Sequence, residues 1–273
     1  MLEALGSSAT TPISWTADDV VVYAAAIGAD PSTDLDHLDL SRGPSVLPTF
    51  LGARVFREGQ ALNLWERWAF DPHATFTLAC DMSFHRRAPS SNDGGAAETV
   101  ATAVWDKGSS AVVITETGVT IDSQLMCSVI TTMMVQGRGD FGGERGPSRT
   151  PAPALDAAVD LDLDLPANSA ALYQLVGDHN PHSLDPAFAA EMGLPGPISA
   201  GQLLIGAAAL NLTATFADGD HGALKRIAVE FAGSHVIGRP LTMQVQADGT
   251  DAINFAVHSG DQPILLGGRA ELA

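Results

Sequence analysis

The sequence predicts an α+β fold in which one layout, a helix followed by an antiparallel sheet, occurs twice. Thr16 is a typical N-cap residue, and the two aspartates after it favour a helix that ends at Gly28. Runs rich in Val, Ile and Thr, at Val112–Val119 and Cys127–Val135, are separated by turn residues and predict antiparallel strands. A helix of small residues from about 201 to 213 is again followed by strand patterns. The second half therefore repeats the order of the first, as expected after a duplication.

A segment without helical or strand periodicity separates the two halves. Gly and Pro residues are dense between 137 and 166, and an alternating Leu-Asp tail ends the segment. We therefore expect a first domain at 1–138, a linker at 139–166 and a second domain at 167–273. In the second domain the strand patterns lie near 224–232, 240–247, 253–258 and 264–272.

Charge and composition exclude several classes of protein. The 14 Lys and Arg against 32 Asp and Glu give a formal net charge of −18, which opposes binding to nucleic acid or anionic membranes. Cys80 and Cys127 are too few for a disulfide scaffold or a zinc cluster, so we expect two buried free thiols. No signal-peptide pattern is present, and the longest apolar run, Leu203–Leu212, is about half a bilayer span. We expect a cytoplasmic protein with no metal site and no membrane or nucleic-acid partner.

The segment Tyr173–Pro186, YQLVGDHNPHSLDP, carries the residues that point to chemistry. Asp178 and Asn180 alone are also typical of a turn, because both residue types bond their own backbone in loops. The whole segment, however, resembles the signature of the MaoC-like hydratase 2 family, written Y-x-L-S-G-D-x-N-P-L-H-x-D-P. Further similar stretches are Phe188-Ala189, Met192–Leu194, Gly196–Gly201, Tyr23–Ala29, Leu47–Phe50, Val104–Gly108 and Phe141–Pro147.

The resemblance implies a tandem (double) hotdog, in which each half is a long central helix wrapped by a curved antiparallel sheet. It implies reversible syn hydration of a trans-2-enoyl thioester, in which one group takes a proton from water and another protonates the α-carbon. By position, Asp178 would transfer protons and the N–H of Gly201 would stabilise the enolate oxygen. Tyr173, Asn180 and Ala200 would line the substrate site. The N-terminal hotdog, which has no second motif, would hold the acyl tail.

Two histidines of the family pattern are absent from this chain. Ser183 stands where the catalytic histidine is expected, and Ala200 stands where a second histidine precedes Gly201. Serine does not titrate near neutral pH, so it cannot by itself replace the histidine as the group that transfers protons. His182 lies one position early, and in an extended segment its side chain would point away from that of Ser183. It would then reach the site only through a local shift, and Asp178, His182 and Ser183 are the candidate catalytic residues.

Three functions are compatible with the sequence. The first is a hydratase or dehydratase, a hydro-lyase, in which Asp178 is assisted by Ser183 through water or by His182. The second is an altered chemistry in the same pocket, such as dehydration, isomerisation or cyclisation of a natural-product intermediate. The third is a non-catalytic acyl-binding or partner subunit. The expected ligand is an acyl thioester that includes CoA or an acyl carrier, and no separate cofactor is expected. The sequence leaves open whether the chain forms a homodimer or pairs with another hotdog chain.

Overall fold

One antiparallel sheet runs through the whole molecule. The computed structural model describes residues 1–57, 68, 70–71, 74–177 and 179–273. The strands are β1 (Ser8–Trp15), β2 (Thr75–Phe84), β3 (Asn92–Asp106), β4 (Ser110–Ile121), β5 (Gln124–Gln136), β6 (Val159–Asp162), β7 (Leu224–Phe231), β8 (Thr242–Asp248), β9 (Ala252–Ser259) and β10 (Gln262–Leu272). The helices are α1 (Ala17–Ala26), α2 (Leu35–Leu38), α3 (Phe50–Arg57), α5 (Ser169–Val176), α6 (Pro186–Glu191) and α7 (Gly201–Phe216).

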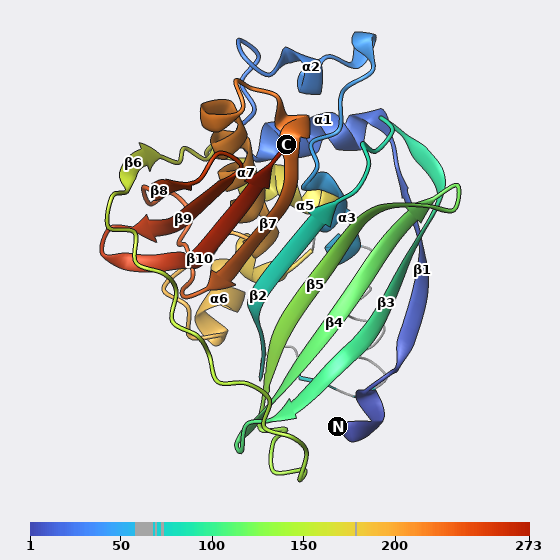
Figure 1. Ribbon diagram of the computed structural model, residues 1–273, viewed down its shortest axis with the longest axis vertical. Helices are drawn as coiled ribbons and strands as arrows, with labels where there is room; N and C mark the ends of the chain where they lie inside the picture. The colour runs from blue at the N-terminus through green and yellow to red at the C-terminus, as the bar shows by residue number, and fades with distance from the viewer. Residues whose placement is uncertain (58–67, 69, 72–73, 178) are drawn as a thin grey trace.

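The two halves of the sheet have the same strand order (Figure 1). In each half the first strand is followed by the third, fourth, fifth and second strands, as β1-β3-β4-β5-β2 and β6-β8-β9-β10-β7. The two second strands, β2 and β7, pair with each other from Ala79 opposite Glu230 to Ser83 opposite Arg226. We call this pairing the seam. The repeated order confirms the expected tandem hotdog of the α+β class.

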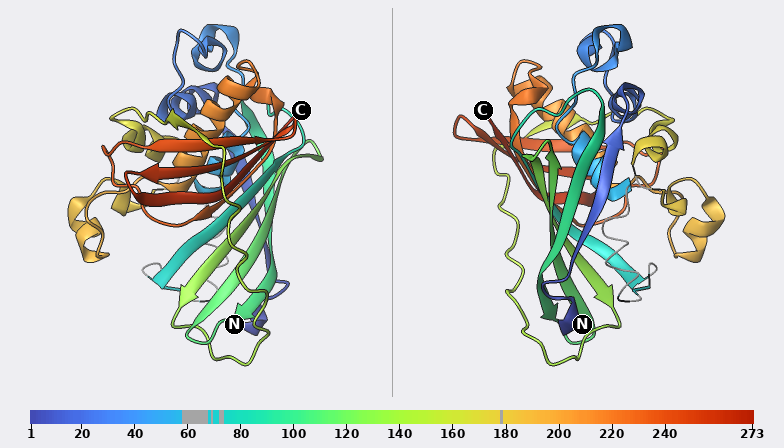
Figure 2. Two further views of the ribbon diagram at one scale, coloured as in Figure 1. Left: turned by 60° about the vertical axis from the view of Figure 1, so that its left-hand side comes forward. Right: turned by 90° about the vertical axis from the view of Figure 1, so that its right-hand side faces the viewer.

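The main helices lie on one side of the curved sheet, and α6 projects at its periphery (Figure 2). A capping box starts α1, because Thr16 accepts from the N–H of Asp19 and the Asp19 carboxylate accepts from the N–H of Thr16. The central helix α7 is buried from Gln202 to Leu210. One hydrophobic core contains residues of both halves, including Tyr23, Phe50, Leu203 and Phe255. The halves therefore share a core as well as a sheet.

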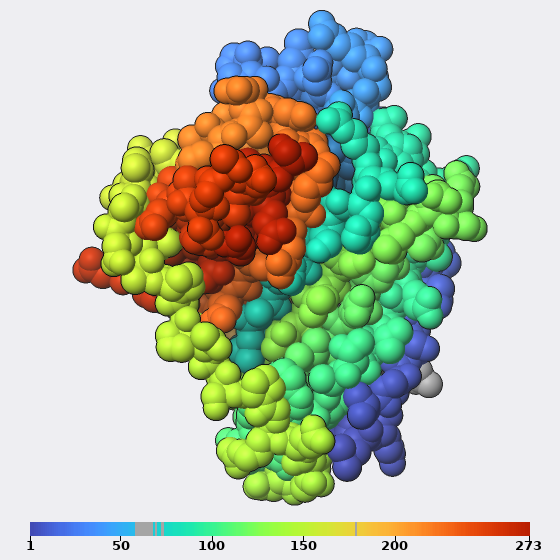
Figure 3. All heavy atoms as spheres, in the orientation of Figure 1, coloured from blue at the N-terminus to red at the C-terminus, as the bar shows by residue number. Residues whose placement is uncertain are grey.

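The segment between the halves runs over the C-terminal half, and its contacts reach from β7 to β8 (Figure 3). Arg149 pairs with Glu230 at 2.6 Å, and the N–H of Ala157 donates to the Gln246 side chain. Strand β6 lies inside the expected linker 139–166 and pairs with β8. The division into 1–138, 139–166 and 167–273 stays a prediction. Cys80 and Cys127 are free and buried, as expected, and no helix among the described residues is long and apolar enough to cross a membrane.

Candidate active site

The motif segment folds as a helix end, a loop, a 3-10 turn and a short helix. The N–H of Gly177 donates to the carbonyl of Tyr173 at 2.6 Å and ends α5. Pro181 begins the 3-10 turn Pro181–Ser183, where its missing N–H is no loss. The carboxylate of Asp185 accepts hydrogen bonds from two N–H groups of the first turn of α6. Asp185 therefore serves as a helix cap within the motif.

Tyr173 and Gly177 pack against each other at the end of α5. The Tyr173 side chain is fully buried. A Cβ atom at Gly177 would lie 2.2 Å from ring carbons of Tyr173, which is far inside van der Waals contact. Only glycine fits at this position without moving the ring. Asp178, the expected proton-transfer residue, follows directly and lies outside the described residues.

The turn after Asp178 is held by main-chain contacts of Asn180. Its carbonyl accepts from the N–H of Ser183 at 3.2 Å and from the Gln174 side-chain amide at 3.0 Å. The Asn180 residue itself is exposed. Its expected role in lining the substrate site stays a prediction, and its carbonyl shapes the turn.

His182 and Ser183 are adjacent but differ in environment. Ser183 is 3% exposed, and its hydroxyl has no hydrogen-bond partner among the described residues. His182 is half-buried, and its carbonyl accepts from the N–H of Ile198 at 3.2 Å. The segment is a 3-10 turn and not an extended strand, so successive side chains are separated by about 120° and do not alternate between two faces.

Helix α7 begins beside an aromatic ring. Ala200 is the N-cap and provides no side-chain cap, and Gly201 is the first helical residue. A Cβ atom at Gly201 would lie 2.7 Å from Cε1 of Phe231 on β7. The glycine therefore permits the close packing of β7 against the helix start. Ala200 is buried.

A short extended stretch joins the motif turn to the start of α7. The N–H of Ile198 bonds the carbonyl of His182, and Ile198 also forms an isolated bridge with Val236. Next to it, the N–H of Ser199 donates to the carbonyl of His235 at 2.9 Å. The turn with His182 and Ser183 and the helix start at Gly201 are thus connected through three residues. The structure brings these expected site residues into one neighbourhood.

His235 is a buried histidine that the sequence analysis did not single out. Its Nδ1 lies 2.9 Å from Ser199 Oγ, and its Nε2 lies 2.9 Å from the carbonyl of Arg239. Burial lowers the pKa of His235, although the hydrogen bond to Arg239 works in the opposite direction. The residue is 36 positions from Ser199 in the chain, so no local pattern could have indicated the contact.

Gln202 is a second buried polar residue without a sequence signal. Its Nε2 lies 3.3 Å from Sγ of Cys80 on β2, and its Oε1 has no hydrogen-bond partner among the described residues. Burial raises the pKa of Cys80 to about 12, so the group beside the amide is a neutral thiol at physiological pH. The first turn of α7 thus carries a polar side chain across the seam into the N-terminal half.

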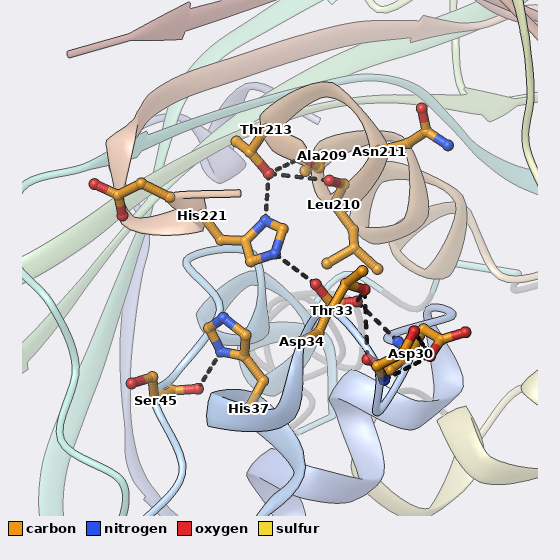
Figure 4. Close-up of polar contacts among 12 residues, drawn as sticks. Asp30, Thr33, Asp34, His37, Ser45, Ala209, Leu210, Asn211, Thr213 and His221 are labelled. Atoms are coloured by element: carbon orange, nitrogen blue, oxygen red, sulfur yellow. Dashed lines mark hydrogen bonds and ion pairs between the residues drawn. The ribbon is translucent and has the colours of Figure 1, made fainter. Parts of the chain in front are cut away.

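A separate polar cluster lies at the other end of α7 (Figure 4). His221 Nδ1 is 2.6 Å from Thr213 Oγ1 on α7, and His221 Nε2 is 3.1 Å from Asp34 Oδ1 of the N-terminal half. The ring of His37 lies 5.0 Å from that of His221. A 16-residue helix is about 24 Å long, so this cluster is remote from Gly201. Its contacts join the halves and do not belong to the site around the motif.

The family model and the relatives that match this chain belong to one kind of protein. The family model of the MaoC like domain matches residues 148–263. The chain is 33% identical over 264 residues to the enoyl-CoA hydratase ChsH3 of Mycobacterium tuberculosis, covering 93% of this chain and 92% of that protein. It is 31% identical to the 3-hydroxyacyl-thioester dehydratase Y of the same organism, covering 80% of this chain and 77% of that protein.

Solved structures show the same architecture. A MaoC-like dehydratase from Phytophthora capsici superposes with a TM-score of 0.83 and 20% identity, over 99% of this chain and 96% of that one. At this identity the superposition shows the shared fold alone. The sheet order, the helix packing and the similarity along nearly the whole chain define a double-hotdog protein. The chain belongs to the MaoC-like dehydratase family.

Proposed function

We propose that this chain is an enoyl-thioester hydratase/dehydratase with a changed catalytic site. One observation carries the proposal: the hydrogen bond from Ile198 N–H to the His182 carbonyl holds the motif turn beside the start of α7. This contact supports a site in which the proton-transfer motif and the N–H of Gly201 act on one substrate. The identity to an enoyl-CoA hydratase over most of both chains supports the same reaction class.

The reaction adds water across the double bond next to the thioester. Asp178 takes one proton from the water, whose oxygen forms a bond to the β-carbon while the carbon–carbon double bond becomes single. The negative charge that develops on the thioester oxygen is stabilised by the N–H of Gly201 and the positive end of α7. The proton taken from water is then delivered to the α-carbon. The reverse sequence removes water, and neither direction consumes a cofactor.

Ser183 supplies the second contact to water in this proposal. It occupies the position of the missing histidine, it is buried, and its hydroxyl has no described partner. A hydroxyl both donates and accepts, so it can hold the water while Asp178 carries the proton. Because Ser183 does not titrate near neutral pH, we expect a slower enzyme than one with an aspartate and histidine pair.

The test is steady-state kinetics on enoyl-CoA substrates from crotonyl-CoA to longer chains. We expect Asp178→Asn to lower kcat/KM by about a thousandfold and Ser183→Ala by about tenfold. His182→Gln reports on the alternative group, and His179→Gln, at an exposed position, is the control. A loss on His182→Gln as large as that on Asp178→Asn, with Ser183→Ala unaffected, would assign the second role to His182. No turnover by the wild type on any chain length refutes the proposed function.

The proposal also concerns whether the chain acts without a partner chain. Both hotdogs are present in one chain and share the seam, so we expect the isolated chain to be sufficient for activity. Size-exclusion chromatography of the active fraction tests this directly. Activity that requires an added hotdog partner chain would point instead to a subunit role.

A further inference from the structure

Gln202 is a polar residue in an otherwise apolar stretch of α7. It is the second residue of the helix, it is 4% exposed, and Leu203, Leu204 and Ile205 follow it. Buried side-chain amides in folded proteins normally have hydrogen-bond partners at both ends. An isolated amide at this depth therefore requires an explanation beyond packing.

The hydrogen bonding of Gln202 is incomplete whichever way the amide is turned. One end of the amide contacts Cys80 at 3.3 Å, and a neutral thiol can either accept from Nε2 or donate to Oε1. The other end has no partner among the described residues. A thiol is a weak partner in both cases. One strong hydrogen-bonding group of Gln202 is thus left for a ligand or a water molecule.

Gln202 lies next to the residues that would bind the substrate in the proposed function. It follows Gly201, whose N–H is the oxyanion donor in the proposed function on which this inference rests. Its side chain crosses the seam, and Oε1 lies 3.3 Å from where a Cβ atom of Gly52 on α3 would be. The same position would lie 2.5 Å from Sδ of Met82, so the flexible thioether of Met82, and not a side chain of residue 52, fills the space beside the amide. Gln202 thus lies between the thioester end of the site and the N-terminal hotdog, the expected place of the acyl tail.

We propose that Gln202 determines specificity by binding a hydroxyl group on the acyl tail of the substrate. A hydroxyl satisfies the free end of the amide in either orientation, because it can both donate and accept. The substrate class is then a hydroxylated enoyl thioester, and a plain alkyl chain leaves the amide unpaired. Leaving one buried polar group unpaired corresponds to a discrimination of about 10- to 100-fold in kcat/KM.

The test compares octenoyl-CoA with analogues that carry a hydroxyl at each carbon from C4 to C8. We expect the wild type to prefer one hydroxylated analogue by about 10- to 100-fold, and Gln202→Leu to abolish this preference. We also expect Gln202→Leu to raise Tm, since it replaces an incompletely bonded amide by an apolar side chain in an apolar environment. Gln202→Asn, which keeps a shorter amide, should retain part of the preference.

A purely structural glutamine gives the opposite result. Gln202→Leu would then lower Tm and leave the ratio of kcat/KM values unchanged, and this outcome overturns the inference. A wild type that prefers plain chains overturns it as well. If the wild type turns over none of the substrates, the proposed reaction fails, and the inference is tested by the Tm shift that saturated octanoyl-CoA and its hydroxylated analogues produce. Equal shifts in the wild type would contradict it.

Discussion

His235 is held in one tautomer by its two hydrogen-bond partners. The carbonyl of Arg239 can only accept, so Nε2 carries the hydrogen and Nδ1 accepts from the Ser199 hydroxyl. Ser199 lies two residues before Gly201, and the N-cap Ala200 offers no side-chain bond. The histidine therefore fixes the approach to α7 where a capping side chain is absent.

Two substitutions of His235 separate its two contacts. Asparagine keeps a polar group near the place of Nδ1, whereas glutamine keeps one near the place of Nε2. We expect His235→Asn to retain most of kcat, and His235→Gln to lower kcat about tenfold with little change in KM, because the contact to Ser199 positions Gly201. Ser199→Ala should reproduce the glutamine variant. Equal kcat values in all three variants, with changes in Tm alone, would make the contact structural only.

Sequence reasoning reached part of this site and not the rest. The turn around Asn180 and the start of α7 near Gly201 were predicted from local residue types, and the cap at Asp185 was not predicted. The contacts of Gln202 and His235 were not, because they join residues 122 and 36 positions apart. The Gln202 contact depends on how the two halves pack, and the His235 contact depends on how the C-terminal half folds. No periodicity within either segment encodes them.

At the scale of single elements, α7 shows how well a sequence pattern predicts the bounds of a helix. The small-residue run predicted a helix from about 201 to 213, and the helix extends to Phe216. Strands β4 and β5 contain the predicted runs and are longer than those runs. Strand β1 was not among the predicted strands and contains Pro12, which is tolerated because β1 is at an edge of the sheet. Boundaries and edge strands depend on neighbours more than on local residues.

Gly206 makes the packing of α7 against α1 testable. A Cβ atom there would lie 2.5 Å from the Tyr23 hydroxyl, which bonds Thr49 at 2.9 Å. We expect Gly206→Ala to lower the free energy of unfolding by about 1–3 kcal/mol, although alanine favours helices more than glycine does. Urea unfolding followed by circular dichroism measures the change. Gly94→Ala, on β3 with no heavy atom within 4 Å of its Cβ position, is the control.

A double variant checks the cause of that loss. Tyr23→Phe removes the hydroxyl that the new methyl group meets. Combining it with Gly206→Ala should therefore cost less than the sum of the two single changes. Additive losses would show that the contact with Tyr23 does not cause the destabilisation.

At the scale of the whole molecule, polar contacts tie the halves together at the seam. Arg226 on β7 bonds both carboxylate oxygens of Asp81 on β2, at 2.9 and 2.6 Å, and also pairs with Glu271 at 3.1 Å. The hydrogen bonds to Asp81 raise the pKa of Arg226 further above its usual value. Arg226 and Asp81 are 145 positions apart. The duplication could be predicted from sequence, whereas the continuous sheet could not.

Asp34 forms a second link between the halves, and this link depends on pH. Burial alone would raise the pKa of Asp34, but hydrogen bonds from Asp30 N–H, His221 and Thr33 outweigh it, so the pKa lies below its usual value. A carboxyl group of this kind stabilises the fold above its unfolded pKa of about 3.9. The stabilisation is lost as the pH falls through the folded value. His37 has a pKa lowered by burial, so its contribution declines from a higher pH, below about 6.5.

We therefore expect Asp34→Asn to lower stability at pH 7 and to flatten the loss of stability below about pH 4. Denaturant unfolding at a series of pH values measures both effects. Asp36→Asn is the matched control, because it removes the same charge from the same segment at a side chain that is 78% exposed. The link between the halves would be unimportant if Asp34→Asn and Asp36→Asn gave the same curve. If instead the Asp34 variant alone shows a flatter acid limb, the hydrogen bonds that Asp34 accepts, among them the one that joins it to His221, stabilise the fold at neutral pH.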